Sequence, residues 1–407
     1  MLKRVHIKGF RSCQDVLIDD LGSMTALIGR NGSGKTNILR ALETLGRIAR
    51  SSDLGSAEFD RAPFFSVGSI EIDAERDNAV YRYIFGIHEE PRAAKNGSSV
   101  QRPVIKESLA VQTQAGKWRT LVDRIDREIG IAGHSEPIPI PPATFALPTI
   151  AAFLPGSNDV QEHVRRLLLF LRTIRYYPFD ETSEVAGTDW KYYVSERDHQ
   201  RWLILRQSYS EMVDSVVLRL FHAYQEEEEH FKEILSLLGR DGLGLIDDIV
   251  VHTYGPSDTS KGDAADQEGE CYALRFRLGR LLGGDPRLHF YRELSLGTRR
   301  VLRIIASLVM DDCTLMLIEQ PEDCIHPGLL KKLIDILRAN VDPAQIILSS
   351  HSAEVFNRLK PEDIRLVSIH RGATTVRPLT RRETSAAARF VSEDGTLADF
   401  LETVQEG

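Results

Sequence analysis

A stretch near the start of the chain, GRNGSGKT (residues 29–36), has the residue types and spacing of a phosphate cradle, G-x-x-x-x-G-K-[ST]. Its glycines let backbone N–H groups turn toward phosphate oxygens, because glycine has no Cβ in the way. Lys35 is expected to reach the terminal phosphates of ATP, and Thr36 to place its hydroxyl on Mg²⁺. The residues expected to bind the nucleotide here are Asn31, Gly32, Ser33, Gly34, Lys35, Thr36 and Asn37.

The residues on both sides of this stretch support that interpretation over a chance glycine-rich turn. Residues 24–28 form a short apolar strand, and apolar residues recur at helical spacing after Thr36. A helix that begins at the loop directs its free N–H groups and its dipole toward an anion.

A second anion site is predicted at LSLGTR (residues 294–299). Ser295 and Gly297 precede an apolar periodic run, so they lie at the start of a helix. Alone, this hexapeptide fits an ordinary N-capped core helix equally well.

Two buried strands end in polar residues that could complete a nucleotide site. Residues 315–318 lead into Glu319, a carboxylate that can hold Mg²⁺ directly or through water. Residues 346–348 lead into Ser349, Ser350 and His351, and His351 could hydrogen-bond the terminal phosphate. A solvated or capping histidine is the alternative for His351.

The order of cradle, serine–glycine segment, acidic strand and histidine resembles that of the ABC-type ATPases. Within them the chain is similar to the SMC/RecF/OLD-like branch, the AAA_15 and AAA_21 type of AAA family ATPases. The resembling segments are IKGFRS (7–12), TALIGRNGSGKTN with Asn37, PEDCIHP (321–327), and SSHSAEVFNRL. Asn37 favours this branch over transporter subunits, and His326 and Pro327 occupy the D-loop position. The resemblance covers roughly residues 1–50 and 272–370.

This resemblance implies an α/β P-loop head, with a mixed sheet flanked by helices, an antiparallel β flank and a helical insertion. It also implies that two heads sandwich ATP, with Lys35 and Thr36 of one copy facing Ser295 and Gly297 of another. The chain would then act as a homodimer or a higher oligomer. Arg11 matches an early basic residue that lies near the phosphates in relatives, and a surface role is the alternative.

Gln320 occupies the position where the family usually carries a catalytic glutamate. A glutamine can orient water but cannot accept a proton, so the reaction would depend on positioning and charge stabilisation. Glu322 could supply the carboxylate instead, Gln320 could give slow turnover, or the residue could be an engineered Glu→Gln trap. A native Gln320 with slow or stimulated hydrolysis is the preferred hypothesis. The predicted catalytic residues are Glu319, Gln320, Glu322 and His351.

Three domains are predicted: an N-terminal lobe (1–156), a helical insertion (157–245) and a C-terminal lobe (246–407). Antiparallel strands are expected within residues 66–125 and a proline-rich connector at 136–148. Residues 160–174 and 201–238 have helical patterns that do not sustain heptads, which favours a compact subdomain over coiled-coil arms. The polar segment 255–270 is predicted to be a mobile loop.

The composition narrows the function class. The net charge of −8 argues against a strongly basic DNA-coating surface, although a local basic groove fits. The sequence contains no apolar run of about 18 residues, so no membrane span is expected. Four scattered cysteines without a C-x-x-C pair disfavour disulfides and zinc and fit the cytoplasm.

Too few residues follow His351 for a Toprim nuclease domain of about 100 residues, so an ATPase without its own effector is expected. The favoured hypothesis is an ATP-driven switch that controls a separate effector, often a nuclease, in anti-phage defence. A RecF/SMC-like DNA clamp and an ATP-binding scaffold with little hydrolysis are the alternatives. DNA is therefore a further candidate partner.

Overall fold

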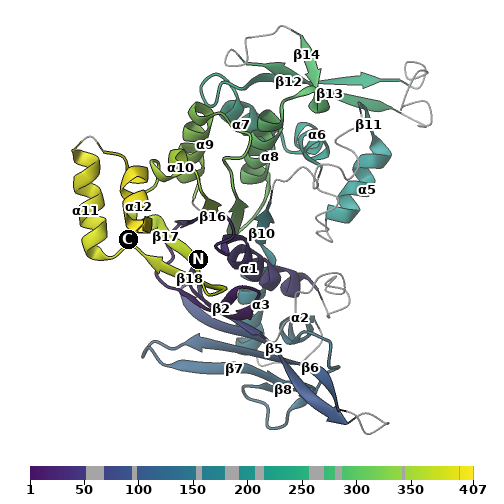
Figure 1. Cartoon of the computed structure of the whole chain (residues 1–407). Coiled ribbons are helices and arrows are strands. Elements are labelled where there is room, and N and C mark those ends of the chain that lie inside the picture. The colour runs from purple at the N-terminus through teal and green to yellow at the C-terminus, as the bar shows by residue number, and fades with distance from the viewer. Residues whose placement is uncertain are drawn as a thin grey trace. The chain divides into compact units, whose positions relative to one another are not determined.

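The chain groups into two compact units in the computed structural model (Figure 1). Unit 1 comprises Met1–Tyr177, Cys313–Glu319 and Val341–Gly407, and unit 2 comprises Pro178–Asp312 and Gln320–Asn340. The structure describes residues 1–51, 68–93, 99–152, 158–178, 192–206, 215–255, 270–279, 287–341, 344–393 and 395–406. No helix within these ranges is long and apolar enough to cross a membrane.

The centre of unit 1 is a six-stranded sheet whose strands are parallel except at one edge. In spatial order its strands are β10 (Ile174–Tyr177), β15 (Leu315–Glu319), β16 (Gln345–Ser350), β3 (Met24–Ile28), β17 (Ile364–His370) and β18 (Ala373–Pro378). β3 and β16 are buried along their whole lengths, as expected of strands covered on both faces. The strands predicted around residues 24–28, 315–318 and 346–348 are therefore confirmed.

The other sheet of unit 1 has eight antiparallel strands. In spatial order they are β2 (Cys13–Ile18), β1 (Leu2–Phe10), β4 (Gly68–Arg76), β5 (Ala79–Ala93), β6 (Ser99–Gln112), β7 (Trp118–Ile125), β8 (Glu128–Ile131) and β9 (Ile138–Pro139). This sheet is the predicted β flank. A two-residue turn, Arg11 and Ser12, joins β1 to β2, because Phe10 pairs with Cys13.

Unit 1 also contains helices, and some of them contact its sheets (Figure 1). They are α1 (Lys35–Arg50), α2 (Ala146–Ala152), α3 (Asn158–Arg172), α10 (Ala353–Phe356), α11 (Arg381–Ser392) and α12 (Leu397–Glu406), with a 3₁₀ turn, η6, at Pro361–Asp363. The apolar residues that follow Thr36 at helical spacing are fully buried on α1: Ile38, Leu39, Leu42 and Leu45. They join one hydrophobic core with residues of both sheets and of α3.

Unit 2 combines helices with a small antiparallel sheet. Its helices are α5 (Glu196–Arg206), α6 (Val216–Glu226), α7 (Glu228–Leu238), α8 (Leu296–Met310) and α9 (Pro327–Ala339), with a 3₁₀ turn, η5, at Tyr291–Glu293. Its strands are β11 (Val194–Ser195), β12 (Ile246–Tyr254), β13 (Cys271–Leu278) and β14 (Leu288–Phe290). Helices α6, α7 and α8 pack on one another.

Some sequence-based boundaries differ from the structure. The connector predicted at 136–148 contains β9 and the first turn of α2, because Ile138 pairs with Ile129 of β8. The helix predicted over 160–174 ends at Arg172, and Ile174 already belongs to a strand of the parallel sheet. The helical pattern over 201–238 is divided among α5, α6 and α7.

The predicted three-domain division stays a prediction. Its boundary at residue 157 places α3 and β10 in the insertion, whereas both lie in unit 1. Most of the segment predicted to be a mobile loop, residues 256–269, lies outside the described residues.

A buried ion pair links the β flank to the segment that precedes α2. Arg124 is fully buried, and its Nη1 lies 2.8 Å from Oε1 of Glu107, which is 1% exposed. Arg124 also donates to the carbonyls of Pro142 and Thr144, and Glu107 accepts from the backbone N–H of Ala146 at 2.8 Å. These bonds fix the path of the chain from β9 into α2.

We expect Arg124→Leu to lower the free energy of unfolding of unit 1 by about 3–5 kcal/mol, because Glu107 would remain buried without its counter-charge. Urea denaturation followed by circular dichroism measures this change. Lys232→Leu, which removes an exposed ion pair with Glu228 on α7, serves as the control and should cause no measurable loss. Equal unfolding midpoints for the two variants would contradict the assigned role of the buried pair.

Candidate functional site

The register of the parallel strands brings the predicted site residues of unit 1 to one edge of the sheet. Glu319 of β15 pairs with Ser349 of β16, and Ser350 of β16 pairs with Ile28 of β3. Gly29 and His351 follow their strands at this same carboxyl edge. Ligands of parallel α/β sheets bind at such an edge.

The phosphate-cradle loop (residues 29–34) needs its glycines. A Cβ at Gly29 would lie 2.1 Å from the carbonyl oxygen of Val367, and one at Gly34 would lie 2.0 Å from Oγ1 of Thr374. Gly34 also has φ 103°, in the left-handed region that side chains rarely adopt. α1 begins directly after it, at Lys35, so the helix N-terminus points its free N–H groups into the loop.

Lys35 folds back over this loop. Its side chain is largely buried, and its ammonium donates to the carbonyls of Gly29 at 2.7 Å and Arg30 at 3.0 Å. Backbone carbonyl oxygens thus bind the Lys35 ammonium group at the position where a terminal phosphate is expected. A phosphate oxygen, being fully charged, is the stronger acceptor for an ammonium group.

Thr36 and Glu319, the two residues predicted to bind Mg²⁺, are in direct contact. The Thr36 hydroxyl donates to Oε1 of Glu319. One hydroxyl and one carboxylate are the hard oxygen donors that Mg²⁺ takes from proteins, with phosphate and water completing its shell. The Thr36–Glu319 pair therefore fits Mg²⁺ by the chemistry of its donors.

Tyr176 of β10 contacts the same carboxylate from the other side. Its hydroxyl donates to Oε2 of Glu319, and its side chain is 9% exposed. Burial raises the pKa of the Tyr176 phenol, and the Arg40 guanidinium offsets this only in part, so the phenol keeps its proton. Arg40 of α1 lies over the Tyr176 ring, with its guanidinium carbon 4.1 Å from the ring centroid.

A directed series of hydrogen bonds braces the cradle loop. Arg11 donates to Oδ1 of Asn37 at 3.3 Å, and Nδ2 of Asn37 donates to Ser12 at 2.7 Å. Ser12 Oγ lies 2.7 Å from Oγ1 of Thr374, which donates to the carbonyl of Ser33 at 3.0 Å. Each hydroxyl accepts one hydrogen bond and donates the next, so the bonds polarise one another. The β1–β2 turn and β18 thereby hold the loop in place.

Arg11 is exposed, and it lies beside this loop. It has φ 53°, a left-handed conformation that costs energy in a residue other than glycine. Its bond to Asn37 brings it to the first turn of α1, one residue after Thr36. His351 is exposed at the end of β16, and the following N–H, of Ser352, donates to Ser350 Oγ at 3.0 Å.

The second predicted anion site lies in unit 2. Ser295 caps α8, since its hydroxyl accepts from the backbone N–H of Thr298 at 3.2 Å, and the residue is exposed. Gly297 is buried, and a Cβ there would lie 2.2 Å from the carbonyl oxygen of Cys324. Only glycine therefore allows the first turn of α8 to approach the segment after Glu319 this closely.

That segment, residues 320–325, is held in an unusual conformation. Gln320 has φ 44° and Cys324 has φ 61°, both left-handed. The Gln320 carbonyl accepts a hydrogen bond from Nη2 of Arg300 at 2.6 Å, and Arg300 lies 3.8 Å from a carboxylate oxygen of Asp323. Burial lowers the pKa of Arg300, and Asp323 opposes that shift. His326 follows and caps α9, accepting from the N–H of Gly328.

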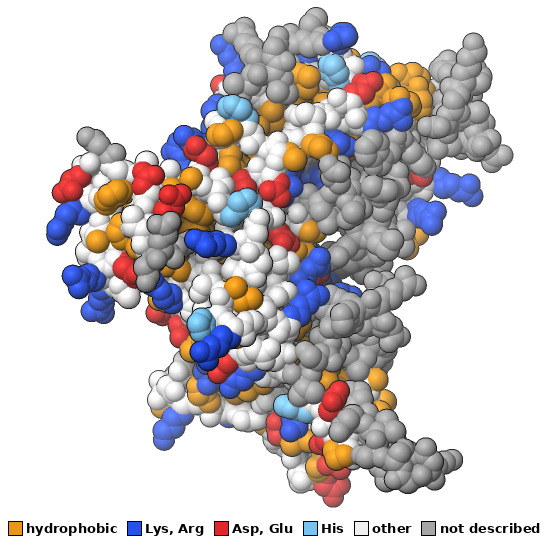
Figure 2. All heavy atoms as spheres, viewed as in Figure 1, with side chains coloured by type: hydrophobic (Ala, Val, Ile, Leu, Met, Phe, Trp, Pro, Cys, Tyr) orange, Lys and Arg blue, Asp and Glu red, His pale blue; other side chains and the backbone are white. Residues whose placement is uncertain are grey.

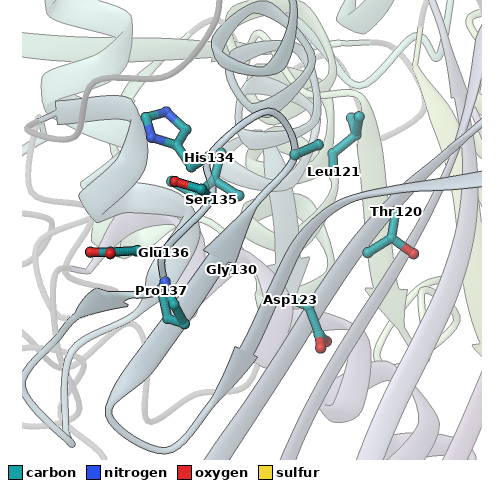
Figure 3. Close-up of a pocket in the computed structure, with 10 residues that line it drawn as sticks. Thr120, Leu121, Asp123, Gly130, His134, Ser135, Glu136 and Pro137 are labelled. Atoms are coloured by element: carbon teal, nitrogen blue, oxygen red, sulfur yellow. The ribbon is translucent and has the colours of Figure 1, made fainter.

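A hollow of about 260 Å³ lies elsewhere in unit 1, on the β7–β8 part of the antiparallel sheet (Figure 3). Asp123, His134 and Glu136 are among the residues that line it. None of the predicted site residues lines it, so it is separate from the phosphate cradle.

Within unit 1 the structure brings together Arg11, the cradle loop, Thr36, Asn37 and Glu319. Ser295, Gly297, Gln320 and Glu322 belong to unit 2. Sequence reasoning missed three residues at the first group: Ser12, Tyr176 and Thr374. Ser12 is the last residue of IKGFRS but was given no role there, and no short motif marks Thr374. Tyr176 was missed because its strand follows directly on the helical pattern of α3.

Comparisons with known proteins agree with this geometry. Residues 24–357 match the model of the AAA_21 family, described as "AAA domain, putative AbiEii toxin, Type IV TA system". An OLD nuclease from Thermus scotoductus is 25% identical over 430 aligned residues, which cover 100% of this chain and 69% of that protein.

Two further relatives are more distant or match only a part. The DNA replication and repair protein RecF of Trichormus variabilis is 32% identical over 108 residues, which cover 25% of this chain and 27% of that protein. The crystal structure of an SmcHead bound to the C-winged helix domain of ScpA superposes with a TM-score of 0.48 at 12% identity, covering 95% of this chain and 99% of that chain. The family match spans both the phosphate cradle and the acidic strand, so this chain belongs to the AAA_21 family and is an ABC-type ATPase of the SMC/RecF/OLD branch.

Proposed function

We propose that this chain is an ATP-binding, slowly hydrolysing switch that pairs through its heads and controls a separate effector, with a nuclease as the favoured candidate. The observation that carries the proposal is the contact between Thr36, at the end of the phosphate cradle, and Glu319, at the end of the acidic strand. The first turn of α1 and the end of β15, from distant parts of the chain, meet there as a hydroxyl–carboxylate pair.

In this proposal the chain binds the triphosphate with groups that are already oriented. The N–H groups of the loop and of the first turn of α1 face the phosphates, and Lys35 exchanges its carbonyl partners for phosphate oxygens. Thr36 and Glu319 would hold Mg²⁺ between them. Mg²⁺–ATP supplies a polarised γ-phosphoryl group, whose transfer depends mainly on positioning and charge stabilisation.

Pairing of two copies would complete the site. Ser295 is exposed at the N-terminus of α8, where free N–H groups and the helix dipole favour an anion. Its hydroxyl caps the helix and lies 2.8 Å from Oγ1 of Thr298, and when Thr298 donates in that contact the Ser295 proton is available for a phosphate oxygen. We therefore place Ser295 and Gly297 of one copy against the phosphates bound by its partner.

Slow hydrolysis follows from Gln320. Its left-handed backbone and the bond from Arg300 to its carbonyl fix the position of the residue. An amide there can orient water but cannot remove a proton. Glu322 is nearly buried in the same segment and is the alternative base.

The effector assignment rests on the relatives. An OLD nuclease is among the relatives of this chain, which supports a nuclease as the kind of effector that the switch controls. We place this switch in anti-phage defence and in the cytoplasm.

The RecF match supports a second candidate, a clamp that closes on DNA when ATP binds. The net charge of −8 favours the first candidate, and on the face drawn in Figure 2 the described basic and acidic side chains are interspersed. Salt-dependent DNA binding with a steep negative slope would favour the second.

Lys35→Ala should weaken ATP binding about 10- to 100-fold, because the loop would lose a charged hydrogen bond to phosphate. Equilibrium titration with a fluorescent ATP analogue measures the affinity. The matched control is Lys232→Ala on the exposed surface of α7, which should bind as the parent chain does. Unchanged affinity in Lys35→Ala would place the nucleotide elsewhere.

Ser295→Arg should leave ATP binding intact but prevent ATP-dependent pairing, because a large side chain would stand where the partner's phosphates are expected. Cys324 offers a readout, since it is the exposed cysteine among the four and its carbonyl contacts Gly297. In the parent chain and in Ser295→Thr, which keeps the capping hydroxyl, ATP should slow alkylation of Cys324. If ATP protects Cys324 equally in Ser295→Arg, the two-headed site is wrong.

Gln320→Glu should raise steady-state phosphate release about 100-fold or more, because a carboxylate can accept a proton from water. Glu322→Ala in the parent chain distinguishes the two possible bases: it should leave the slow rate nearly unchanged if Gln320 positions the water. Fast turnover in the parent chain that survives Glu322→Ala would exclude the slow-switch proposal.

A further inference from the structure

Both oxygens of the Glu319 carboxylate accept hydrogen bonds from side chains on different elements. Thr36 of α1 donates to Oε1, and Tyr176 of β10 donates to Oε2. The pairing of β10 with β15 fixes where Tyr176 lies, because its main chain is level with Leu317, two residues before Glu319. Side chains two residues apart on a strand share a face, so Tyr176 stands on the Glu319 side of the sheet and reaches along it.

We propose that Tyr176 is a positioning residue for Mg²⁺: it holds Oε2 of Glu319 and so keeps Oε1 turned toward Thr36 and the metal. This inference rests on the proposed ATPase site and names a residue that the sequence motifs do not contain. It makes Tyr176 part of the support of the metal site, while the metal contacts stay with Thr36 and Glu319.

The two donors must behave differently when the metal binds. Thr36 has to present a lone pair to Mg²⁺, so its O–H must turn away from Glu319. Oε1 of Glu319 would then be available to the cation. Under this inference Mg²⁺ would take Oε1, so the Tyr176 bond to Oε2 would not compete with the metal. It can persist and prevent rotation of the carboxylate about its terminal bond. Outer groups that orient a ligand in this way typically change metal affinity 10- to 100-fold.

Arg40 holds the Tyr176 ring from the same helix that carries Thr36. Arg40 follows Thr36 by four positions, so both side chains lie on one face of α1. The guanidinium lies over the ring, 4.1 Å from its centroid, and its Nη1 donates to Oε2 of Glu43 at 2.9 Å. Glu43 is nearly fully buried, which limits the movement of Arg40. The tyrosine is therefore constrained at its face as well as at its hydroxyl.

A purely structural tyrosine would act differently. Loss of its hydroxyl would then lower stability without changing how the site responds to Mg²⁺. A positioning role predicts a specific effect: nucleotide binding without metal stays normal, and the Mg²⁺ concentration needed for tight binding rises.

The test compares Tyr176→Phe with the parent chain and with Tyr81→Phe. Tyr81 is also buried in unit 1 and its hydroxyl lies 3.0 Å from His163, away from the cradle, so its variant loses an equivalent bond. Binding of a fluorescent, non-hydrolysable ATP analogue is titrated with Mg²⁺ and repeated in EDTA. Thermal unfolding without nucleotide is recorded for each chain.

We expect Tyr176→Phe to shift the Mg²⁺ midpoint upward about 10- to 100-fold while its affinity in EDTA matches the parent chain. Tyr81→Phe should leave both values unchanged. A parental midpoint in Tyr176→Phe, or an equal shift in Tyr81→Phe, would overturn the inference. Parental analogue binding by Lys35→Ala, by contrast, would refute the proposed ATP site itself, so the two failures are distinguishable.

Discussion

The hydrogen bond between Thr36 and Glu319 is the interaction on which the candidate nucleotide site of unit 1 depends. It joins residues 283 positions apart, and it forms only because β15, β16 and β3 run parallel and end at one edge. α1 begins directly after the cradle loop, since Gly34 can adopt a left-handed conformation and approach Thr374. Any change in strand register would move the hydroxyl away from the carboxylate.

The supports of this pair come from opposite edges of the sheet. β10 supplies Tyr176 on one edge, and β18 supplies Thr374 on the other. Neither side chain is expected to touch the nucleotide. They restrict the positions of groups that would, which reduces the reorganisation required at the moment of reaction. The phosphate-cradle loop is a short sequence motif, but the side chains that hold it and Glu319 in place come from strands at both edges of the sheet.

Local patterns were sufficient to predict the cradle, the strand that leads into it and the buried face of α1. Their signals are contiguous and short-range: glycines that must lack a side chain, and apolar residues at helical spacing. Ser12 and Thr374 were not predictable, because their partnership depends on how β2 and β18 are placed by distant pairings. Tyr176 was not predicted as a site residue because the predicted helix extended to residue 174. In the structure α3 ends at Arg172, and β10 begins two positions later, at Ile174.

The close approach of Gly297 to the Cys324 carbonyl has a consequence for the rates of hydrolysis and of pair separation under the proposed function. With no side chain between them, the start of α8 and the segment that begins at Gln320 share a backbone contact and cannot be displaced independently. Arg300, three residues after Gly297 on the same helix, holds the Gln320 carbonyl as well. Under the proposed function, a rearrangement at the hydrolysis position would therefore alter the surface offered to a second copy. The lifetime of a pair and the speed of its chemistry would then be set by the same few atoms.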